Sequence, residues 1–498
     1  MSLFNKENFQ KFGRFANALN TGLQAAQAAQ QVYQAVNGTG TQNGTTNQQL
    51  QPSQREITFV QPNAAEKGDK NKSLFGEFNE EFLKKNISLI NQHRPSDGFT
   101  PLICAVLRKC LDSASVNATD SKGNTALHYA DTPLIVKALI IFRADLNIKN
   151  KAGNDSLSAK LWDELKIIEN ATTTTSPSLQ TKINEHKQQI AIQCQFRKGE
   201  EDKKRSLRLL SLDGGGIKGL VLIQILMELE DICGNTENFV TKNFDWIAGT
   251  STGAILALAL ADGYKPIQCL RLYLRLKDEI FLTRSNPLVP YPDDKIEKFL
   301  KENFGENRKM ANIKNKKLKV FVTATKADQI PIKMILYRSL MANNPGVTLL
   351  LEVFKNIDFQ ALSDKNENPP PDLAFMLSLG TGKSPEVAVP IPEFSPELGL
   401  QGIIQTVQSL NNLKSILVEQ LSTSDGQVVE IARYMSHTRR VPYFRLTPSL
   451  NTDIQLDTVD NTLLIEMLWT TKEYIREKCS TDILSLLELF SAFNRSNE

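Results

Sequence analysis

The second half of the chain alternates short apolar runs with longer segments in which apolar residues recur at helical intervals. Short runs of this kind, separated by helix-like stretches, are typical of the strands of a parallel sheet. The pattern therefore predicts an α/β domain with a largely parallel sheet. The predicted strands are residues 207–212, 244–251, 318–325, 332–337 and 373–380.

The two ends of the chain have different patterns. Residues 1–36 carry aromatic and leucine side chains at mostly helical spacing with few charges, which predicts an amphipathic helix. Such a helix lies at a membrane interface, directs the chain to an organelle such as the mitochondrion, or packs against a partner. The polar, glycine-rich residues that follow predict a disordered linker. From about residue 400 onward the pattern is mostly helical and carries no catalytic motif.

A short pattern repeats between residues 97 and 160. Each copy contains a glycine, then threonine or aspartate two positions later, then leucine two positions after that. The copies are "DGFTPLICAV" (97–106), "KGNTALHYAD" (122–131) and "KAGNDSLSAK" (151–160). This segment resembles ankyrin repeats, whose T-P-L-H-x-A signature is divided between the first two copies.

The ankyrin resemblance implies short helical units that bury a core only by stacking on neighbours. The glycines of the copies, Gly98, Gly123 and Gly153, are 25 and 30 residues apart. A regular ankyrin repeat has ~33 residues, so we expect a short, irregular stack that docks onto another surface at one end. His128 falls in the signature and is expected to be a structural hydrogen-bond partner.

Composition adds limits to this picture. The chain has 498 residues, 41% hydrophobic and 23% charged, which is ordinary for a soluble globular protein. A formal charge of +3 does not favour nucleic acid as a partner. The six cysteines form no C-x-x-C pair, which favours free thiols in a reducing compartment. No apolar run approaches the ~18 residues that a spanning helix needs, so we expect an intracellular, cytoplasmic protein with peripheral membrane contact.

The stretch "SLDGGGIKGL" (211–220) permits two interpretations, a dinucleotide-binding turn or an anion-binding loop beside a nucleophile. A dinucleotide site needs an acidic residue about 20 positions later, at the end of the second strand. That strand ends in "DWIAGTSTG", with threonine and serine instead. "LSLGTGKS" (377–384) is not a phosphate loop either, because Leu377 stands where the first glycine is required.

The second predicted strand ends in "GTSTG" (249–253), a G-x-S-x-G motif followed by an apolar helix. In this context the motif predicts a nucleophile elbow that exposes the hydroxyl of Ser251, with Gly249 and Gly253 leaving room for the sharp turn. The helix N-terminus behind Ser251 supplies positive potential where an oxyanion forms. The backbone N–H groups of Gly214, Gly215 and Gly216 are candidate oxyanion donors.

The combination of "DGGGIKG" (213–219) and "GTSTG" resembles the patatin-like acyl hydrolases. With the ankyrin-like segment upstream, the chain resembles the calcium-independent (group VI) phospholipases A2, and "ANNP" (342–345) and "LSLGTG" (377–382) match further motifs of that subfamily. The resemblance implies a patatin-like three-layer sandwich preceded by a short α-helical ankyrin stack. It also implies Ser251 as nucleophile and Gly214, Gly215 and Gly216 as the oxyanion hole.

The same resemblance implies substrates and partners. The expected reaction is cleavage of the sn-2 fatty-acyl ester of glycerophospholipids, or of other fatty-acyl esters or thioesters, without a metal or other cofactor. The expected partners are a phospholipid membrane surface and, through the ankyrin-like repeats, another protein or a second copy of the chain.

One part of the family pattern is missing. The family uses a Ser–Asp dyad, with the aspartate in a D-G-G or D-G-A motif shortly before "ANNP". Here Tyr337 stands in that place, followed by Arg338 and Ser339. A tyrosine with its usual pKa near 10 is a poor general base at neutral pH. The flanking sequences resemble segments that the family separates by a few tens of residues, so we infer an internal shortening near residues 339–340.

This departure leaves two hypotheses, an active lipid acyl hydrolase and a catalytically impaired regulatory form that retains the repeats. Another carboxylate would have to replace the aspartate in the first case. The candidates are Asp213, Asp262, Asp358, Asp364, Asp372 and Asp425. Of these, Asp213 is expected to be a structural turn residue, and Asp262 to lie at the far end of the helix that begins at Ser251.

The resulting domain prediction divides the chain into six parts. They are an amphipathic helix (1–36), a disordered linker (37–80), ankyrin-like repeats (81–165), a second linker (166–206), an acyl hydrolase domain (207–395) and a mostly helical C-terminal region (396–498).

Overall fold

The computed structural model of the chain describes the second half and part of the repeat segment. The described residues are 116–117, 119, 122–158, 161, 206–234, 238–281, 293–307, 309–313, 317–323, 343–363, 371–385 and 425–493. All of them belong to one compact unit that comprises Phe75–Glu386 and Leu421–Glu498. The predicted N-terminal helix (1–36), linker (37–80), first repeat copy (97–106) and strand at 332–337 lie outside the described residues.

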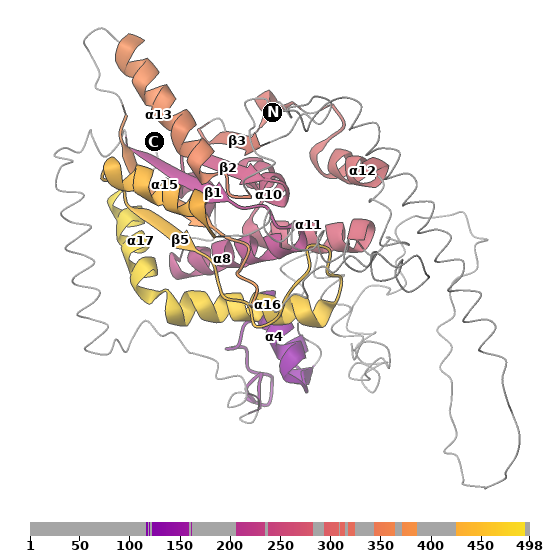
Figure 1. Ribbon diagram of the computed structural model, residues 1–498. Helices are drawn as coiled ribbons and strands as arrows, with labels where there is room; N and C mark the ends of the chain where they lie inside the picture. Colours follow the sequence, from indigo (N-terminus) through magenta and orange to yellow (C-terminus); the bar gives the residue numbers. More distant parts are fainter. Residues whose placement is uncertain are drawn as a thin grey trace, which may run out of the picture. The chain divides into compact units, whose positions relative to one another are not determined.

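The described strands form a five-stranded sheet in the order β3-β2-β1-β4-β5, and every pairing is parallel (Figure 1). Four of the predicted strands are confirmed, and they correspond to β1 to β4. The strands are β1 (Leu207–Leu212), β2 (Trp246–Thr250), β3 (Lys319–Thr323), β4 (Leu373–Leu379) and β5 (Tyr443–Leu446).

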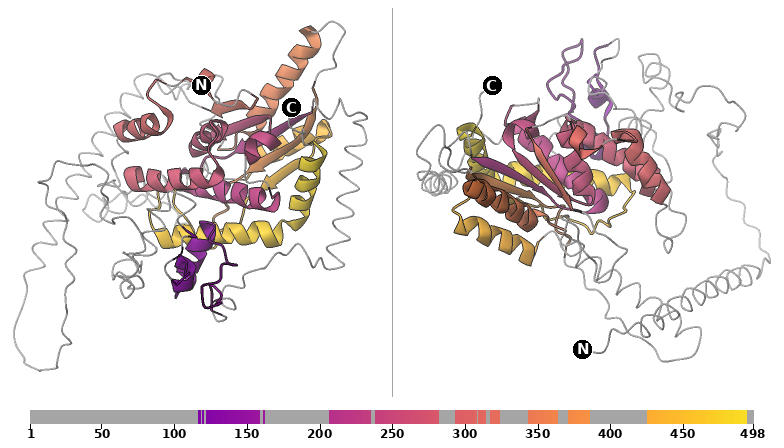
Figure 2. Two further views of the ribbon diagram at one scale, coloured as in Figure 1. Left: turned by 180° about the vertical axis from the view of Figure 1, so that it is seen from behind. Right: turned by 90° about the horizontal axis from the view of Figure 1, so that it is seen from above.

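Helices cover both faces of the sheet, which gives the predicted three layers (Figure 2). Because both faces are buried, β1 and β4 are nearly continuous apolar runs rather than alternating ones. On one side of the sheet lie α8 (Gly219–Ile232), α10 (Thr252–Ala261), α11 (Pro266–Leu276) and α17 (Ser480–Ala492), and α16 (Asn461–Glu473) packs on α8. On the other side lie α13 (Gly346–Ser363) and α15 (Gln427–Thr438).

Further helical elements lie between these helices and the strands along the chain. They are η2 (Gly216–Lys218), α9 (Phe239–Asn243), η3 (Lys277–Phe281), α12 (Asp293–Phe304), η4 (Met310–Asn312) and η5 (Tyr474–Lys478).

The C-terminal region is helical in α15, α16 and α17, as expected, but it also contains β5. This strand pairs with β4 and completes the edge of the sheet. The sheet therefore continues past residue 395, where the sequence pattern ends the hydrolase domain. A strand of only four residues, "YFRL", is too short for a periodic signal.

The second repeat copy forms η1 (Ala126–Tyr129) and α4 (Pro133–Ile141). His128 has the predicted structural role, because its Nδ1 accepts a hydrogen bond of 3.1 Å from the Thr125 backbone N–H. The predicted docking is also present, since α4 packs against α16 (Figure 1). The repeat also contacts α8, where the Arg143 guanidinium bonds the buried carboxylate of Glu230 over 2.5 Å.

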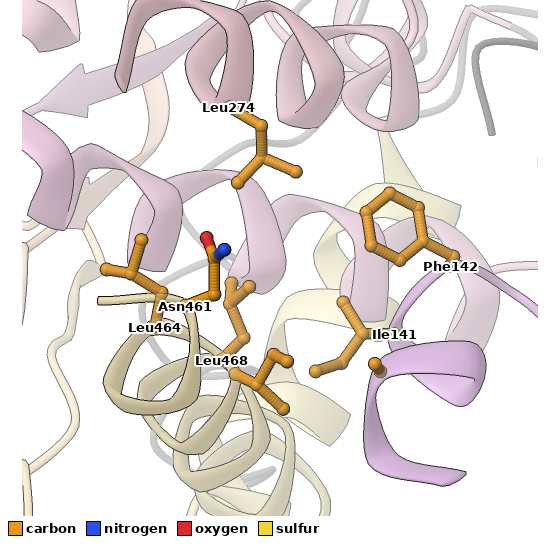
Figure 3. Close-up of a pocket in the computed structure, with 8 residues that line it drawn as sticks. Ile141, Phe142, Leu274, Asn461, Leu464 and Leu468 are labelled. Atoms are coloured by element: carbon orange, nitrogen blue, oxygen red, sulfur yellow. The ribbon is translucent and has the colours of Figure 1, made fainter. Parts of the chain in front are cut away.

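A small apolar pocket lies where α4 meets α11 and α16 (Figure 3). Phe142 from the repeat and Leu274 from α11 line it, and Asn461 is its one polar lining residue. The pocket contains no nucleophile or carboxylate, so it is a packing gap between the repeat and the sheet-covering helices rather than a site for chemistry.

Candidate active site

Ser251 lies between the end of β2 and the start of α10, at the predicted sharp turn. Its backbone has φ 53° and ψ −122°, a conformation that non-glycine residues adopt at a cost of about 1–3 kcal/mol. The residue is exposed. A strained, exposed serine between strand and helix is the geometry of a nucleophile elbow.

The two glycines of the motif are required by space. A Cβ on Gly249 would collide with the backbone of Gly253, which lies in the first turn of α10. A Cβ on Gly253 would collide with the carbonyl oxygens of Leu212 and Asp213 at the end of β1. Glycine at both positions therefore lets the elbow close and lets it approach the neighbouring strand.

The glycine loop that follows β1 meets the elbow. Leu212 pairs with Gly249 in the parallel register of β1 and β2, so the carboxyl ends of the two strands lie side by side. A Cβ on Gly214 would be 3.1 Å from the Cβ of Ser251. The pairing of the glycine loop with the serine, which the sequence suggested, is thus present in the structure.

The backbone N–H groups of this loop are not equivalent. The Gly214 N–H donates to the carbonyl oxygen of Asn343 over 3.0 Å, and the Ile217 N–H donates to that of Leu456 over 2.8 Å. The N–H groups of Gly215 and Gly216 have no acceptor among the described residues. Gly215 and Gly216 therefore retain donors that an anion at this position can use, whereas the Gly214 donor is engaged.

Three distant segments hold the loop in place. Asn343 comes from the "ANNP" motif and Leu456 from the loop before α16. Thr381 comes from "LSLGTG": its hydroxyl donates to the Gly214 carbonyl oxygen over 3.2 Å, and a Cβ on Gly215 would be 2.7 Å from its side chain. Both secondary motifs thus have a physical function, since each supports the glycine loop directly.

Asp213 is fully buried beside this loop, and its carboxylate faces Arg445 of β5. Two hydrogen bonds join them, Nη1 to Oδ1 at 3.2 Å and Nη2 to Oδ2 at 2.5 Å. Burial raises the pKa of the Asp213 carboxyl to about 6, although Arg445 opposes the shift. The structure therefore agrees with a structural role for Asp213, because both carboxylate oxygens bond Arg445.

Other candidate carboxylates are either distant from Ser251 or engaged with other groups. Asp262 ends the ten-residue helix α10, which makes it about 15 Å distant along the axis. Asp372 precedes β4, at the opposite end of the strands from Ser251, and its carboxylate accepts a hydrogen bond from the Leu373 N–H over 2.8 Å. Asp425 pairs with Lys383 and lies 3.5 Å from the Arg445 Nε.

Asp358 is exposed on α13, and Asp364 lies outside the described residues. Among the residues that the structure describes, no carboxylate is hydrogen-bonded to the Ser251 hydroxyl. Tyr337, Arg338 and Ser339, at the position expected for the dyad aspartate, also lie outside the described residues.

Three further properties bear on the chemistry. In the described part of the chain, no three His, Cys, Asp or Glu side chains are grouped so that they hold a metal ion. No helix there combines the length and apolar character needed to cross a membrane. The described cysteines, Cys233, Cys269 and Cys479, are free thiols.

The sequence did not single out Arg445, Thr381 or Leu456. The only available signal was the serine and glycines of "LSLGTG" at a strand end, which was used as a family motif rather than as a contact. Arg445 stands 232 residues from Asp213 in a short strand, so no local pattern connects them.

Comparison with known proteins agrees with this geometry. The profile of the patatin-like phospholipase family matches residues 210–382, and that of the ankyrin repeat matches residues 122–151. The "85/88 kDa calcium-independent phospholipase A2" of Rattus norvegicus is 33% identical over 332 residues, which cover 55% of this chain and 40% of that protein. The "Intracellular phospholipase A2" of Caenorhabditis elegans is 27% identical over 453 residues, which cover 73% and 41%.

A shorter match concerns the "Calcium-independent phospholipase A2-gamma" of Homo sapiens, which is 42% identical over 80 residues, or 16% of this chain. The chain spans less than half the length of the first two relatives. The chain therefore carries a patatin-like phospholipase domain and an ankyrin repeat, and it is homologous to proteins named calcium-independent phospholipase A2.

Proposed function

We propose that this chain is a lipid acyl hydrolase in which Ser251 is the nucleophile. The observation that carries the proposal is the strained, exposed Ser251 beside Gly214, in a patatin-like phospholipase domain. The substrate class is the glycerophospholipids, cleaved at the sn-2 ester, since the relatives are named phospholipases A2. No metal or other cofactor has a part in this proposal.

In the proposed reaction the Ser251 Oγ attacks the acyl carbon and the carbonyl oxygen becomes an oxyanion. The N–H groups of Gly215 and Gly216 donate to that oxygen, and removal of one such donor typically costs about 2.7–4 kcal/mol of transition-state stabilisation. The lysophospholipid leaves, and water then hydrolyses the acyl-serine. Gly214 contributes by its lack of a side chain, which allows the loop to approach the Ser251 Cβ.

The proton of the Ser251 hydroxyl must pass to a base. The candidate carboxylates Asp213, Asp372 and Asp425 are engaged and Asp262 is distant, so the base of an active enzyme is a residue other than these four. We place the reaction at a membrane surface that the protein contacts peripherally from the cytoplasm. A role of residues 1–36 in mitochondrial association is testable by fractionation of cells that express the chain with and without them.

The direct test combines covalent labelling with turnover. Wild-type protein is incubated with a fluorophosphonate probe and, separately, with phosphatidylcholine vesicles that carry a labelled sn-2 chain. Ser251→Ala should abolish both labelling and release of the labelled fatty acid. Ser485→Ala, which removes a buried hydroxyl that donates to the Thr481 carbonyl oxygen on α17, should retain both. The absence of any labelling of folded wild-type protein would exclude the hydrolase.

A second candidate function is a non-catalytic form that acts through its repeat. Tyr337 in place of the dyad aspartate favours it. In this case the ankyrin repeat recruits a protein partner or a second, longer copy. Folded protein that neither reacts with the probe nor releases fatty acid, yet co-sediments with a full-length relative, supports this form.

A further inference from the structure

Arg445 reaches Asp213 across an intervening strand. In the sheet register Ser211 of β1 pairs with Ser378 of β4, and Ser378 pairs with Arg445 of β5. Asp213 is two positions beyond Ser211, so its side chain leaves the same face of the sheet. The guanidinium of an edge-strand residue therefore crosses β4 to bond a carboxylate at the end of β1.

The strand in between is shaped for this crossing. Ser378 is small, and its hydroxyl accepts a hydrogen bond of 2.8 Å from the Arg445 Nη1. Two residues later, a Cβ on Gly380 would be 2.7 Å from the Arg445 Nη2. The serine and the first glycine of "LSLGTG" thus leave the space that the arginine occupies, while the Thr381 that follows supports the glycine loop.

The pair is buried and fork-shaped. The Arg445 side chain is 4% exposed and that of Asp213 is 0% exposed. Arginine suits this position because its planar guanidinium bonds both carboxylate oxygens at once, which a lysine ammonium cannot reproduce. Loss of the guanidinium would leave the Asp213 carboxyl buried without a partner.

The Asp213 backbone contacts both β4 and the serine elbow of the candidate site. Its N–H donates to the Leu379 carbonyl oxygen over 3.1 Å, and its own carbonyl oxygen lies against Gly253 of the elbow. The next residue along the chain is Gly214. A displaced Asp213 therefore moves the glycine loop and the serine elbow relative to each other.

We propose that Arg445 is a positioning residue, which holds Asp213 and through it the Gly214–Gly216 loop in register with Ser251. The effect of Arg445 on catalysis rests on the hydrolase proposed above, whereas its effect on the position of the loop does not. The same guanidinium is linked to the "ANNP" motif, because Ser378 also accepts a hydrogen bond of 3.1 Å from the Asn344 Nδ2.

The test compares two buried arginine–carboxylate pairs, one near the carboxyl ends of the strands and one near their amino ends. Arg445→Lys changes the proposed positioning residue. The matched control is Arg208→Lys, because the Arg208 side chain is 3% exposed and its Nε bonds Asp245 over 3.0 Å, near the amino ends of β1 and β2. Ser378→Ala, a milder change, removes one partner of Arg445 and keeps both charges.

The first readout is hydrogen exchange in the full chain, resolved for the N–H groups of Asp213, Gly214 and Ile217. These three donate to carbonyl oxygens and report opening of the loop. We expect exchange about tenfold faster in Arg445→Lys, a smaller increase in Ser378→Ala and no local change in Arg208→Lys. Unchanged exchange in Arg445→Lys, or the same acceleration in Arg208→Lys, would overturn the proposal. If Arg445→Lys does not fold, the exchange rates of the same three N–H groups are compared between Ser378→Ala and Arg208→Lys. Faster exchange in Ser378→Ala alone supports the proposal, and equal rates overturn it.

The second readout is turnover of a soluble fatty-acyl ester. A displaced oxyanion loop should lower kcat roughly 10- to 100-fold in Arg445→Lys while KM stays within about twofold, since the loop acts in the transition state. Arg208→Lys should retain the wild-type kcat. A raised KM with unchanged kcat contradicts the positioning role. Wild-type protein without Ser251-dependent turnover would remove the hydrolase proposal, and the exchange comparison would then decide the structural part alone.

Discussion

The Gly214 N–H donates to the Asn343 carbonyl oxygen over 3.0 Å. This bond joins the candidate oxyanion loop to the "ANNP" segment, in front of which the dyad aspartate of related enzymes is expected. The "ANNP" segment therefore still supports the glycine loop, although the sequence before it has no aspartate in the expected position. The candidate oxyanion loop and a complete nucleophile–base pair are thus specified by separate parts of this chain.

Replacement of Ser251 by glycine should stabilise the protein. Glycine adopts φ 53° without the steric cost that serine carries there, so we expect a gain of about 1 kcal/mol in unfolding free energy. Ser251→Ala keeps the strained backbone and should stay within about 0.5 kcal/mol of wild type. Urea unfolding measures both. Equal stability of the glycine and alanine variants would show that the elbow stores no strain.

Replacement of Gly253 by alanine should destabilise the fold by roughly 3 kcal/mol, because the added Cβ collides with the carbonyl oxygens of Leu212 and Asp213. Gly234→Ala is the control, since Gly234 has φ +61° but open space around its Cβ position. That change should cost only about 1 kcal/mol. Similar unfolding midpoints for the two variants would contradict the steric explanation.

The buried Asp213 carboxyl should make stability fall as pH rises. Its pKa is about 6 in the folded protein and 3.8 in its ordinary state, so the folded protein binds this proton more tightly than the unfolded chain. The contribution is fully present below pH 3.8 and is lost as pH rises through 6. We expect the stability of wild type minus that of Asp213→Asn to decrease over this range in urea titrations. An increase would mean that Arg445 outweighs burial.

Two of the ion pairs that join the described part of the repeat to neighbouring helices should differ in strength. Arg143 bonds Glu230, whose side chain is 0% exposed, and burial raises the pKa of that carboxyl. Arg143→Met leaves the carboxyl buried without this partner and should cost about 3 kcal/mol. Lys137 pairs with Glu466, which is 44% exposed, so Lys137→Met should cost less than about 1 kcal/mol. Equal losses in chemical unfolding would mean that the buried pair does not anchor the repeat.

The local parts of the site were predictable because their signals are local. An apolar run, a G-x-S-x-G turn and an apolar helix occupy adjacent residues, so "GTSTG" indicated both the elbow and its serine. The glycine loop was predictable for the same reason, since "DGGG" follows the β1 run directly. Its pairing with the elbow followed from two neighbouring parallel strands, whose carboxyl ends meet at one edge.

The partition of roles within the loop depended on tertiary contacts. The sequence offered three equivalent glycine N–H groups, whereas the bond to Asn343 engages that of Gly214, and those of Gly215 and Gly216 find no acceptor in the described part of the chain. The sequence separated Asp213 and Asp262 from the other candidate carboxylates, but it did not name the partners of any of them. The structure shows that Arg445 bonds the Asp213 carboxylate. It also shows that Asp372 lies before β4, at the opposite end of the parallel strands from Ser251.

The amino-acid sequence by itself determined the parallel α/β pattern, the elbow at Ser251, the glycine loop beside it and the helical repeat, because each is specified by residues that follow one another. Only the tertiary structure decided that β5 completes the sheet and that Arg445 crosses β4 to hold Asp213. Those contacts join residues 67 to 232 positions apart, and their energy comes from burial and from a charge pair that exists only after the sheet has formed.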